Sequence, residues 1–200
     1  MWSLLRPAVS MVALCTVVLG LGYPLGITAV ARAVVPDRAG GSLVVVDGVV
    51  VGARDIGQSF VGDAWLHGRP SVTADQPYNA LSSAGSNLGP AHPALRERVA
   101  AAVQAERGTA TIAAIAVPID LVTTSASGLD PHITPAGAAF QIERIATARG
   151  LSRLQVEDAV ARASEGRWLG IFGEPRVSVL AVNLALAQLS STTRATPMVQ

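Results

Sequence analysis

The sequence predicts an α+β soluble domain anchored by a single N-terminal transmembrane helix. An uncharged run extends from Pro7 to Ala31 between Arg6 and Arg32, and strand-like and helix-like segments follow it without strict alternation. As a helix the run would be about 37 Å long, which spans a hydrocarbon core of about 30 Å with some tilt. We therefore expect a transmembrane helix over residues 7–34, an α+β domain over 35–190 and a flexible tail over 191–200.

A cleavable signal peptide is the alternative interpretation of the apolar run. Arg6 gives it a charged start, and both Ala29-Val30-Ala31 and Ala31-Arg32-Ala33 are small-x-small cleavage patterns. The run is longer than the apolar region of a secretory signal, about 7 to 15 residues, and this favours a retained anchor. Glycine and proline between Gly20 and Gly26 are tolerated where neighbouring protein packs against a membrane helix. Charges at the two ends nearly balance and do not set the orientation.

Composition limits the chemistry of the domain. The chain has 15 basic and 14 acidic residues, so nucleic-acid binding has no electrostatic basis. Lysine is absent, which excludes a phosphate-loop lysine and a Schiff-base amine. The only cysteine, Cys15, lies in the apolar run. The domain therefore has no disulfide framework and no thiolate metal site, and core packing must stabilise it.

The first half of the domain contains one strong local signal. Val-rich segments from Ser42 to Val46 and from Val49 to Val51 flank Asp47-Gly48, a two-residue turn that suits a β-hairpin. From Phe60 to His92 the sequence shows no helical or strand-like apolar pattern and is rich in Gly, Ser, Asn and Pro. Such a stretch is a functional loop or disordered, and its aromatic and polar residues favour a structured surface.

Helical spacing returns in the second half. Residues Pro93 to Glu106 have apolar positions on one helical face, and Ile112 to Val122 follows as a buried strand with Pro118 at an edge or an interruption. Three further helices are predicted from their capping residues and apolar spacing. They run from Thr134-Pro135 to Gly150, from a Ser152/Gln155 capping box toward Gly166, and from about Val179 to Leu189, with a frayed tail from Ser190.

The densest polar cluster, residues 123–132, permits two interpretations. Ser125 or Ser127 with His132 could form an anchored or secreted serine hydrolase. Known triads draw their members from distant segments, however, and the chain has no Gly-x-Ser-x-Gly elbow. A polar turn, in which Asp130 and the hydroxyls bond nearby backbone amides, is favoured. The histidines His67, His92 and His132 are too widely spaced for a metal motif, so no metal, cofactor or catalytic residue is predicted.

Seven sequence blocks, in order and over nearly the whole chain, resemble the KdpC family, the C chains of the bacterial Kdp potassium-transporting P-type ATPase. Ala84 and Ala126 stand where that family usually has glycine, and Ser178 where it usually has asparagine. The blocks are Tyr23-Pro24-Leu25, Arg69-Pro70-Ser71, Pro77-Tyr78-Asn79, Ser86-Asn87-Leu88-Gly89-Pro90, Pro118-Ile119-Asp120-Leu121-Val122-Thr123, Ser127-Gly128-Leu129-Asp130-Pro131-His132-Ile133 and Gly173-Glu174-Pro175-Arg176-Val177.

The resemblance implies a non-catalytic, single-pass accessory subunit of a high-affinity potassium uptake pump in the cell membrane. Its partners would be an A chain with the potassium pathway, an ATP-hydrolysing B chain, a small F chain and membrane lipid, with no nucleic acid. The partner subunits would handle ATP, magnesium and potassium. The domain would be extracytoplasmic, over the mouth of the A chain, and would support assembly and activity.

The family is also described as assisting nucleotide binding, and Leu81 to Asn87 resembles the serine-and-glycine signature loop of transporter ATPases. A chain without lysine or a metal-binding carboxylate pair is poorly equipped to hold a triphosphate. We expect instead that the segments Arg69 to Pro90 and Ser127 to Ile133 form a rim that docks on the A chain. The candidate partner-binding residues are Arg69, Tyr78, Asn79, Ser86, Asn87, Asp130 and His132.

Overall fold

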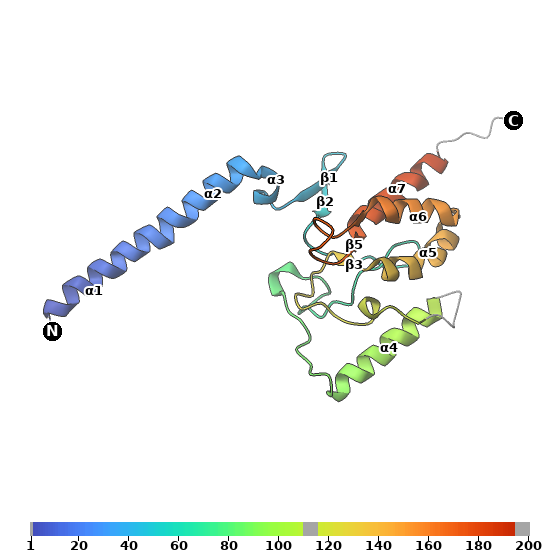
Figure 1. The fold of residues 1–200 in the computed structure, drawn as a ribbon, viewed down its shortest axis with the longest axis horizontal. Coiled ribbons are helices and arrows are strands. Elements are labelled where there is room, and N and C mark those ends of the chain that lie inside the picture. Colours follow the sequence, from blue (N-terminus) through green and yellow to red (C-terminus); the bar gives the residue numbers. More distant parts are fainter. Residues whose placement is uncertain (1, 110–115, 195–200) are drawn as a thin grey trace. The chain divides into compact units, whose positions relative to one another are not determined.

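The computed structural model describes residues 2–109 and 116–194. Two units make up the chain, Met1–Ala53 and Arg54–Gln200 (Figure 1). The first holds the apolar helix and a hairpin. The second holds the α+β fold, so the fold class predicted from the sequence is confirmed.

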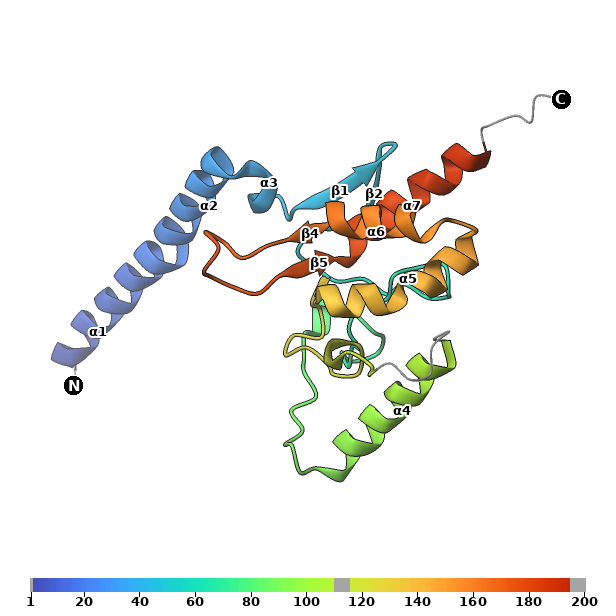
Figure 2. The ribbon, with the colours of Figure 1, turned by 45° about the vertical axis from the view of Figure 1, so that its right-hand side comes forward.

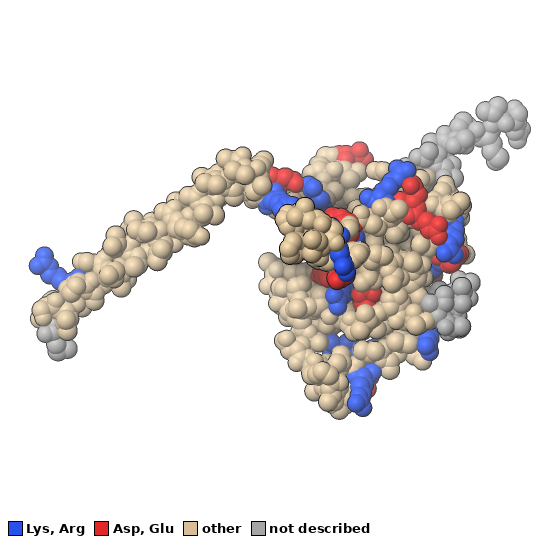
Figure 3. Space-filling model, in the orientation of Figure 1, with Lys and Arg blue, Asp and Glu red and all other residues tan. Residues whose placement is uncertain are grey.

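An apolar helix dominates the first unit. It consists of α1 (Trp2–Cys15), the π-helical η1 (Thr16–Gly22) and α2 (Tyr23–Val34). Over Trp2–Val34 its mean hydropathy reaches 2.0, so its length and composition suffice to cross a membrane. Figure 3 shows an uncharged surface along the helix, between charged residues at its two ends. The helix runs from Trp2 to Val34 and so includes the whole of the transmembrane span predicted over residues 7–34.

The π-helical turn lies directly before Pro24. In that turn the N–H of Tyr23 donates to the carbonyl of Val18, five residues earlier. Pro24 has no N–H to donate to the carbonyl of Gly20, so the regular α-helical ladder is interrupted there. One turn later the hydroxyl of Thr28 donates to the Pro24 carbonyl at 2.7 Å. The helix therefore continues through Pro24 without a break.

The predicted hairpin is confirmed. After α3 (Pro36–Ala39), the strands β1 (Leu43–Val46) and β2 (Val49–Ala53) pair antiparallel, with Val46 opposite Val49. Asp47 and Gly48 both have positive φ, 50° and 79°. Two left-handed residues in succession form the turn whose twist matches paired strands, and Asp-Gly tolerates that geometry best.

The second unit contains a small antiparallel sheet and four longer helices. The strand order is β3-β5-β4, and Ile133 and Ser164 both pair with Val177 of the central strand. Helix α4 stands apart from α5, α6 and α7 (Figures 1 and 2). The elements are η2 (Ala80–Ser82), α4 (Pro93–Thr109), η3 (Ile119–Leu121), β3 (His132–Ile133), α5 (Pro135–Arg149), α6 (Arg153–Arg162), β4 (Ser164–Glu165), β5 (Arg176–Ser178) and α7 (Val179–Arg194).

The core lies between this sheet and helices α5, α6 and α7. Fully buried side chains include Ile145 of α5, Val156 of α6, Val177 of β5 and Leu186 of α7. The predicted caps are confirmed. Thr134 accepts the N–H of Gly137, Gly150 has a left-handed φ of 64°, and Ser152 forms the capping box with Gln155. These caps satisfy helix-end amides that would otherwise lack partners.

The strand predicted over Ile112 to Val122 is wrong in its described part. Residues 112–115 lie outside the described residues, and the chain then passes through irregular backbone into the 3-10 helix η3. Pro118 offers no N–H to a sheet ladder. The carboxylate of Asp120, 4% exposed, turns inward and accepts the N–H of Thr134 at 2.6 Å. The described part of this run, residues 116–122, is therefore partly buried without pairing in a sheet.

Two helix ends also differ from the prediction. Helix α6 stops at Arg162, before Gly166, because Ser164–Glu165 pairs with the central strand. Helix α7 continues past Leu189 to Arg194, so residues 190–194 are helical. Residues 195–200 lie outside the described residues, where the flexible tail stays a prediction.

Side-chain amides hold the irregular segment around Leu66 against the helices. Asn183 of α7, 1% exposed, accepts the Leu66 N–H at 2.8 Å and donates to the Leu66 carbonyl at 2.9 Å. Gln141 of α5 makes the same pair of bonds with His67, at 2.8 and 3.1 Å. Arg144 bonds Gln141 at 2.7 Å and the Asp63 carbonyl at 2.7 Å. These amides take the place of a neighbouring β-strand, so Leu66 can be fully buried.

Replacing Asn183→Ala should lower the free energy of unfolding by about 2 to 4 kcal/mol, because two buried backbone groups of Leu66 lose their partners. Urea unfolding of the full chain in mild detergent, followed by circular dichroism, measures the change. Gln104→Ala, on the exposed face of α4, is the control and should change the value by less than about 0.5 kcal/mol. Equal effects of the two variants would contradict the role given to Asn183.

Candidate functional site

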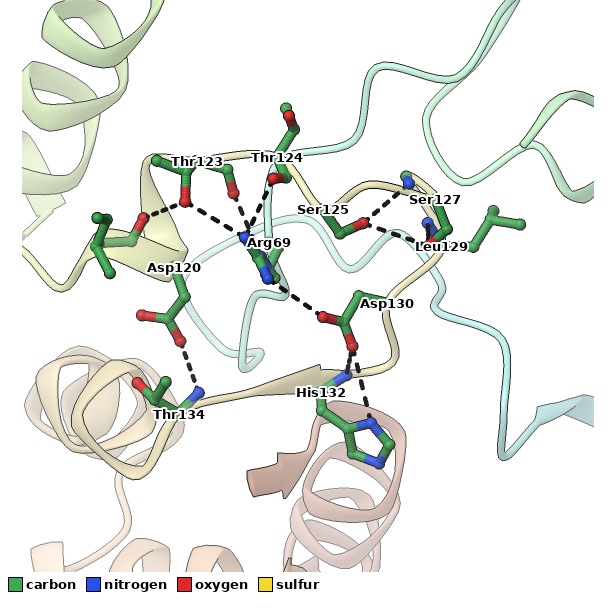
Figure 4. A network of polar contacts seen from close by, with 12 residues as sticks. Arg69, Asp120, Thr123, Thr124, Ser125, Ser127, Leu129, Asp130, His132 and Thr134 are labelled. Atoms are coloured by element: carbon green, nitrogen blue, oxygen red, sulfur yellow. Dashed lines mark hydrogen bonds and ion pairs between the residues drawn. The ribbon is translucent and has the colours of Figure 1, made fainter. Parts of the chain in front are cut away.

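Arg69 links the two loop segments predicted to form the docking rim (Figure 4). Its guanidinium donates to the carbonyls of Thr123 and Thr124, at 3.4 and 3.1 Å, and to the Thr123 hydroxyl at 3.4 Å. A further bond and ion pair joins it to Asp130 Oδ2 at 3.4 Å. Both side chains are partly exposed, so the charge pair itself adds little stability. The four contacts together fix where the 123–130 loop lies.

Asp130 and His132 meet on the other side of this pair. The Oδ1 atom of Asp130 accepts the backbone N–H of His132 at 3.0 Å and lies 3.8 Å from its Nδ1. Partial burial, and then the nearby Arg176, lower the pKa of His132, while Asp130 opposes the shift. The lowered pKa favours the neutral imidazole, so the contact of His132 with Asp130 gains little from charge.

The two serines are bound to the backbone of their own loop. Ser125 Oγ accepts the N–H of Gly128 at 2.9 Å, and Ser127 Oγ accepts the N–H of Leu129 at 3.1 Å. In Figure 4 the hydroxyls lie at one end of the loop and the His132 ring at the other, with Asp130 between them. The polar turn predicted for this cluster is confirmed, and the serine-hydrolase interpretation is not supported.

Tyr78 points into the domain rather than away from it. Its hydroxyl donates to the Arg69 carbonyl at 2.6 Å, and its ring lies between two glycines. A Cβ on Gly57 or on Gly68 would come within 2.6 Å of the Tyr78 side chain. Burial, followed by the charge of Asp130, raises the pKa of Tyr78 to about 12. Tyr78 therefore positions Arg69 and fills space beneath the loops.

The backbone around Tyr78 is tied to the second loop. Tyr78 has a left-handed φ of 60°, and its N–H donates to the hydroxyl of Ser71 at 2.9 Å. That hydroxyl donates in turn to the Gly128 carbonyl at 2.7 Å. Asn79 donates its N–H to Thr73 Oγ1 at 3.0 Å, and Thr73 bonds the Gln76 carbonyl at 2.7 Å. The strained turn is thus held by partners on both sides.

Asn79 caps a short 3-10 turn that presents one apolar side chain to solvent. Its Oδ1 accepts the N–H of Leu81 at 3.0 Å, and its Nδ2 donates to the Ala74 carbonyl at 3.1 Å. Leu81 is 98% exposed, more than any other large hydrophobic side chain described. Leu81 lies within the predicted docking segment Arg69 to Pro90, but it is not among the candidate residues named from the sequence. The feature of the sequence that could have indicated it is a single leucine in the polar segment Asn79 to Ser83.

Ser86 and Asn87 lie farther along the same loop. Ser86 is half-buried, and Asn87 is exposed with a left-handed φ of 52° that asparagine tolerates. The loop touches the 125–128 turn, because the Ser83 hydroxyl donates to the Ser127 carbonyl at 3.0 Å and a Cβ on Gly85 would meet the Ala126 carbonyl at 2.7 Å. Arg69, Tyr78, Asp130 and His132 form one network, with Asn79 joined to it through Thr73. No side-chain bond of Ser86 or Asn87 is described.

Two open hollows flank the Arg69–Asp130 pair. One, of about 320 Å³, also includes His132, Glu174 and Arg176 in its lining. The other, of about 490 Å³, includes Ser125 and Ser127. Among the residues that the structure describes, no group of three or more His, Cys, Asp or Glu side chains could hold a metal ion. The arrangement can present a rigid polar surface with mixed charge, and it brings no nucleophile to a base.

Comparison with known proteins identifies close relatives. The family described as "KdpC: K+-transporting ATPase, c chain" matches residues 5–188. A protein of Sorangium cellulosum named potassium-transporting ATPase KdpC subunit is 53% identical, over 91% of this chain and 96% of its own. Proteins of the same name from Dechloromonas aromatica and Burkholderia vietnamiensis are 48% and 52% identical, over 95% and 93% of this chain and 100% and 96% of theirs.

Alkaline pH should weaken the fold through Tyr78. Since its pKa is about 12 in the folded state and about 10 in the unfolded state, the unfolded chain releases the proton first, and stability present below pH 10 is lost as the pH rises to 12. The loss should be about 1 to 3 kcal/mol larger than in Tyr78→Phe, which has no proton to release. Urea unfolding at several pH values measures both slopes. The chain has no lysine that would titrate between pH 10 and 12 and obscure the effect. The same pH dependence of the unfolding free energy in both proteins would contradict the role given to Tyr78.

Proposed function

This chain belongs to the KdpC family, the c chains of K+-transporting ATPases, and from that premise we propose that it is a non-catalytic accessory subunit of an ATP-driven potassium uptake pump. One observation supports this most strongly. The hydrogen bonds of the polar residues in the candidate site hold two loops against each other, and they do not position a reactive group. Such a surface is suited to assembly, because a rigid surface loses little entropy when a partner binds.

In this proposal the partners carry the chemistry. An A chain provides the potassium pathway, a B chain hydrolyses ATP, and a small F chain completes the complex. ATP, magnesium and potassium are handled by those subunits, and this chain holds no cofactor. The signature-like loop Leu81 to Asn87 supports this view. The Ser83 hydroxyl is bonded to the Ser127 carbonyl, and Gly85 packs on Ala126, so neither is free to cradle a phosphate.

The docking rim on the A chain would comprise the exposed parts of the two loop segments. Leu81 is its apolar anchor, because it is almost fully exposed while the Asn79 cap and the Thr73 bond hold its backbone. A leucine already held outward on a fixed turn loses little conformational entropy when a partner covers it, so it can contribute apolar contact to the interface. Tyr78 and Arg69 act mainly by fixing the rim, so their replacement would disturb the fold together with the docking.

Replacing Leu81→Ser should weaken recovery of the complex by about five- to thirty-fold, the equivalent of roughly 1 to 2 kcal/mol, without changing the unfolding of the isolated chain. Affinity purification in mild detergent, with quantification of the co-purified subunits, measures recovery. Leu154→Ser is the matched control, because Leu154 is a 75% exposed leucine on α6 outside the rim. Unchanged recovery for Leu81→Ser, or equal loss for both variants, would place the interface elsewhere.

The same preparations test the non-catalytic role. Ser127→Ala should leave ATPase turnover per assembled complex unchanged, because its hydroxyl serves the Leu129 amide. Normal assembly with collapsed turnover would show that this chain takes part in catalysis.

We further propose that the apolar helix is retained as a single membrane pass with the bulk of the chain outside the cytoplasm. Protease added to intact cells should then digest the domain, and N-terminal sequencing should find residue 1 or 2. The length of Trp2–Val34 supports the spanning helix. A mature chain that begins at Arg32 or Val34 would show a cleaved signal peptide, and protection of the domain in intact cells would reverse the orientation.

A further inference from the structure

The loop between β4 and β5 exposes four large apolar side chains within five positions. Trp168, Leu169, Ile171 and Phe172 are 69%, 70%, 73% and 60% exposed. We call residues 168–173 the hairpin tip. Figure 2 shows the loop extending beyond the two strands. Exposed apolar residues scattered singly are ordinary, but a contiguous set marks a contact surface.

The hairpin tip has a defined backbone. Trp168 and Phe172 exchange two hydrogen bonds, at 2.8 and 3.0 Å, and their rings lie 5.8 Å apart. Inside this bridge the N–H groups of Gly170 and Ile171 bond the carbonyls of Arg167 and Trp168. Leu169 has a left-handed φ of 53°, a conformation that costs energy for a branched side chain. The fold therefore holds these side chains outward at some cost in stability.

Charges next to the tip are paired. Arg167 bonds Glu174 at 3.0 Å across the neck of the hairpin, and Arg176 bonds Glu165 at 2.6 Å one step further from the tip. Residues 168–173 carry no charge. The tip thus presents an apolar, uncharged end on a hairpin whose flanking charges cancel.

We propose that the hairpin tip inserts into the boundary between lipid headgroups and acyl chains of the membrane that holds the chain's own helix. Four backbone N–H groups of the tip are already bonded within the turn, which lowers the cost of placing backbone in lipid. Tryptophan suits this depth, because its ring can be buried while the indole N–H reaches water or headgroups. Phenylalanine and leucine supply further apolar surface for this boundary. An uncharged tip needs no anionic lipid.

Chain continuity supports lipid as the occupant. The apolar helix ends at Val34, and only residues 35–53 separate it from the second unit. Even fully extended, that linker reaches about 65 Å, so the tip stays at a high effective concentration near the bilayer surface. A weak interfacial contact is sufficient under such tethering. This inference rests on the retained membrane helix of the proposed function, but not on the pump partners.

Tryptophan quenching in vesicles tests the insertion. The full chain with Trp2→Phe and Trp65→Phe keeps Trp168 as its sole tryptophan and is reconstituted into phosphatidylcholine vesicles. Lipid brominated near the top of the acyl chains should reduce its emission by about two-fold or more, and aqueous acrylamide should quench it weakly. The matched control carries Leu154→Trp and Trp168→Phe in the same background. That tryptophan, at a position 75% exposed, should respond to acrylamide and not to brominated lipid.

Two results would overturn the insertion. Trp168 quenched by acrylamide alone would lie in water, and Trp168 protected from both quenchers would be covered by protein. A chain whose sole tryptophan replaces Met11, inside the apolar run, separates this failure from a failure of the anchor. Quenching of that tryptophan by brominated lipid with Trp168 unaffected rejects only the tip insertion. Absence of quenching at position 11 rejects the membrane helix and the inference that rests on it.

Discussion

Two pairs of amide hydrogen bonds support the rest of the second unit. Asn183 and Gln141 bond both backbone groups of Leu66 and His67, respectively, and so attach an irregular segment to α7 and α5 as if it were a strand. Leu66 can then enter the core, and the segment leads directly to Arg69. The position of Arg69 sets that of the 123–130 loop, which in turn contacts the loop around Gly85. Buried polar groups of this kind specify one arrangement, because any other would leave them unpaired.

Hydrogen bonding also explains why the 123–132 loop, which contains hydroxyls, a carboxylate and an imidazole, is suited to binding rather than to catalysis. Ser125 and Ser127 satisfy amides of their own turn, and Asp130 is shared between Arg69 and the amide of His132. A nucleophile needs a free hydroxyl beside a base, and these groups are committed elsewhere. The exposed surface of the two loops therefore has a fixed shape, side chains of both charges and the exposed side chain of Leu81. Those are the properties of a binding surface.

The described apolar residues occupy several different environments. Buried ones on α5, α6 and α7 fill the core, and those of Trp2–Val34 suit a bilayer. Others are exposed, among them Leu154 on α6, Leu81 and the four apolar residues of the hairpin tip. Leu81 and the hairpin tip differ from the other exposed apolar residues, because the tip is a contiguous set and Leu81 lies on a capped turn within the candidate site. Local hydrogen bonds hold the backbone of the Leu81 turn and of the hairpin tip, so little further conformational entropy is lost when a partner or lipid binds.

The sequence by itself determined the features that depend on neighbours a few residues apart. The Asp47-Gly48 hairpin, the Thr134 and Ser152 caps, the long apolar helix and the hydroxyl-to-amide bonds of the 123–132 turn all belong here, since local geometry settles them. Only the tertiary structure decided the matters settled by distant partners. The predicted strand gave way to the Asp120 bond with Thr134, Tyr78 turned inward against Gly57 and Gly68, and Leu81 turned outward. The candidate residues could be placed on two loops from the sequence, but their network required contacts such as Leu66 to Asn183, 117 positions apart, which no local pattern encodes.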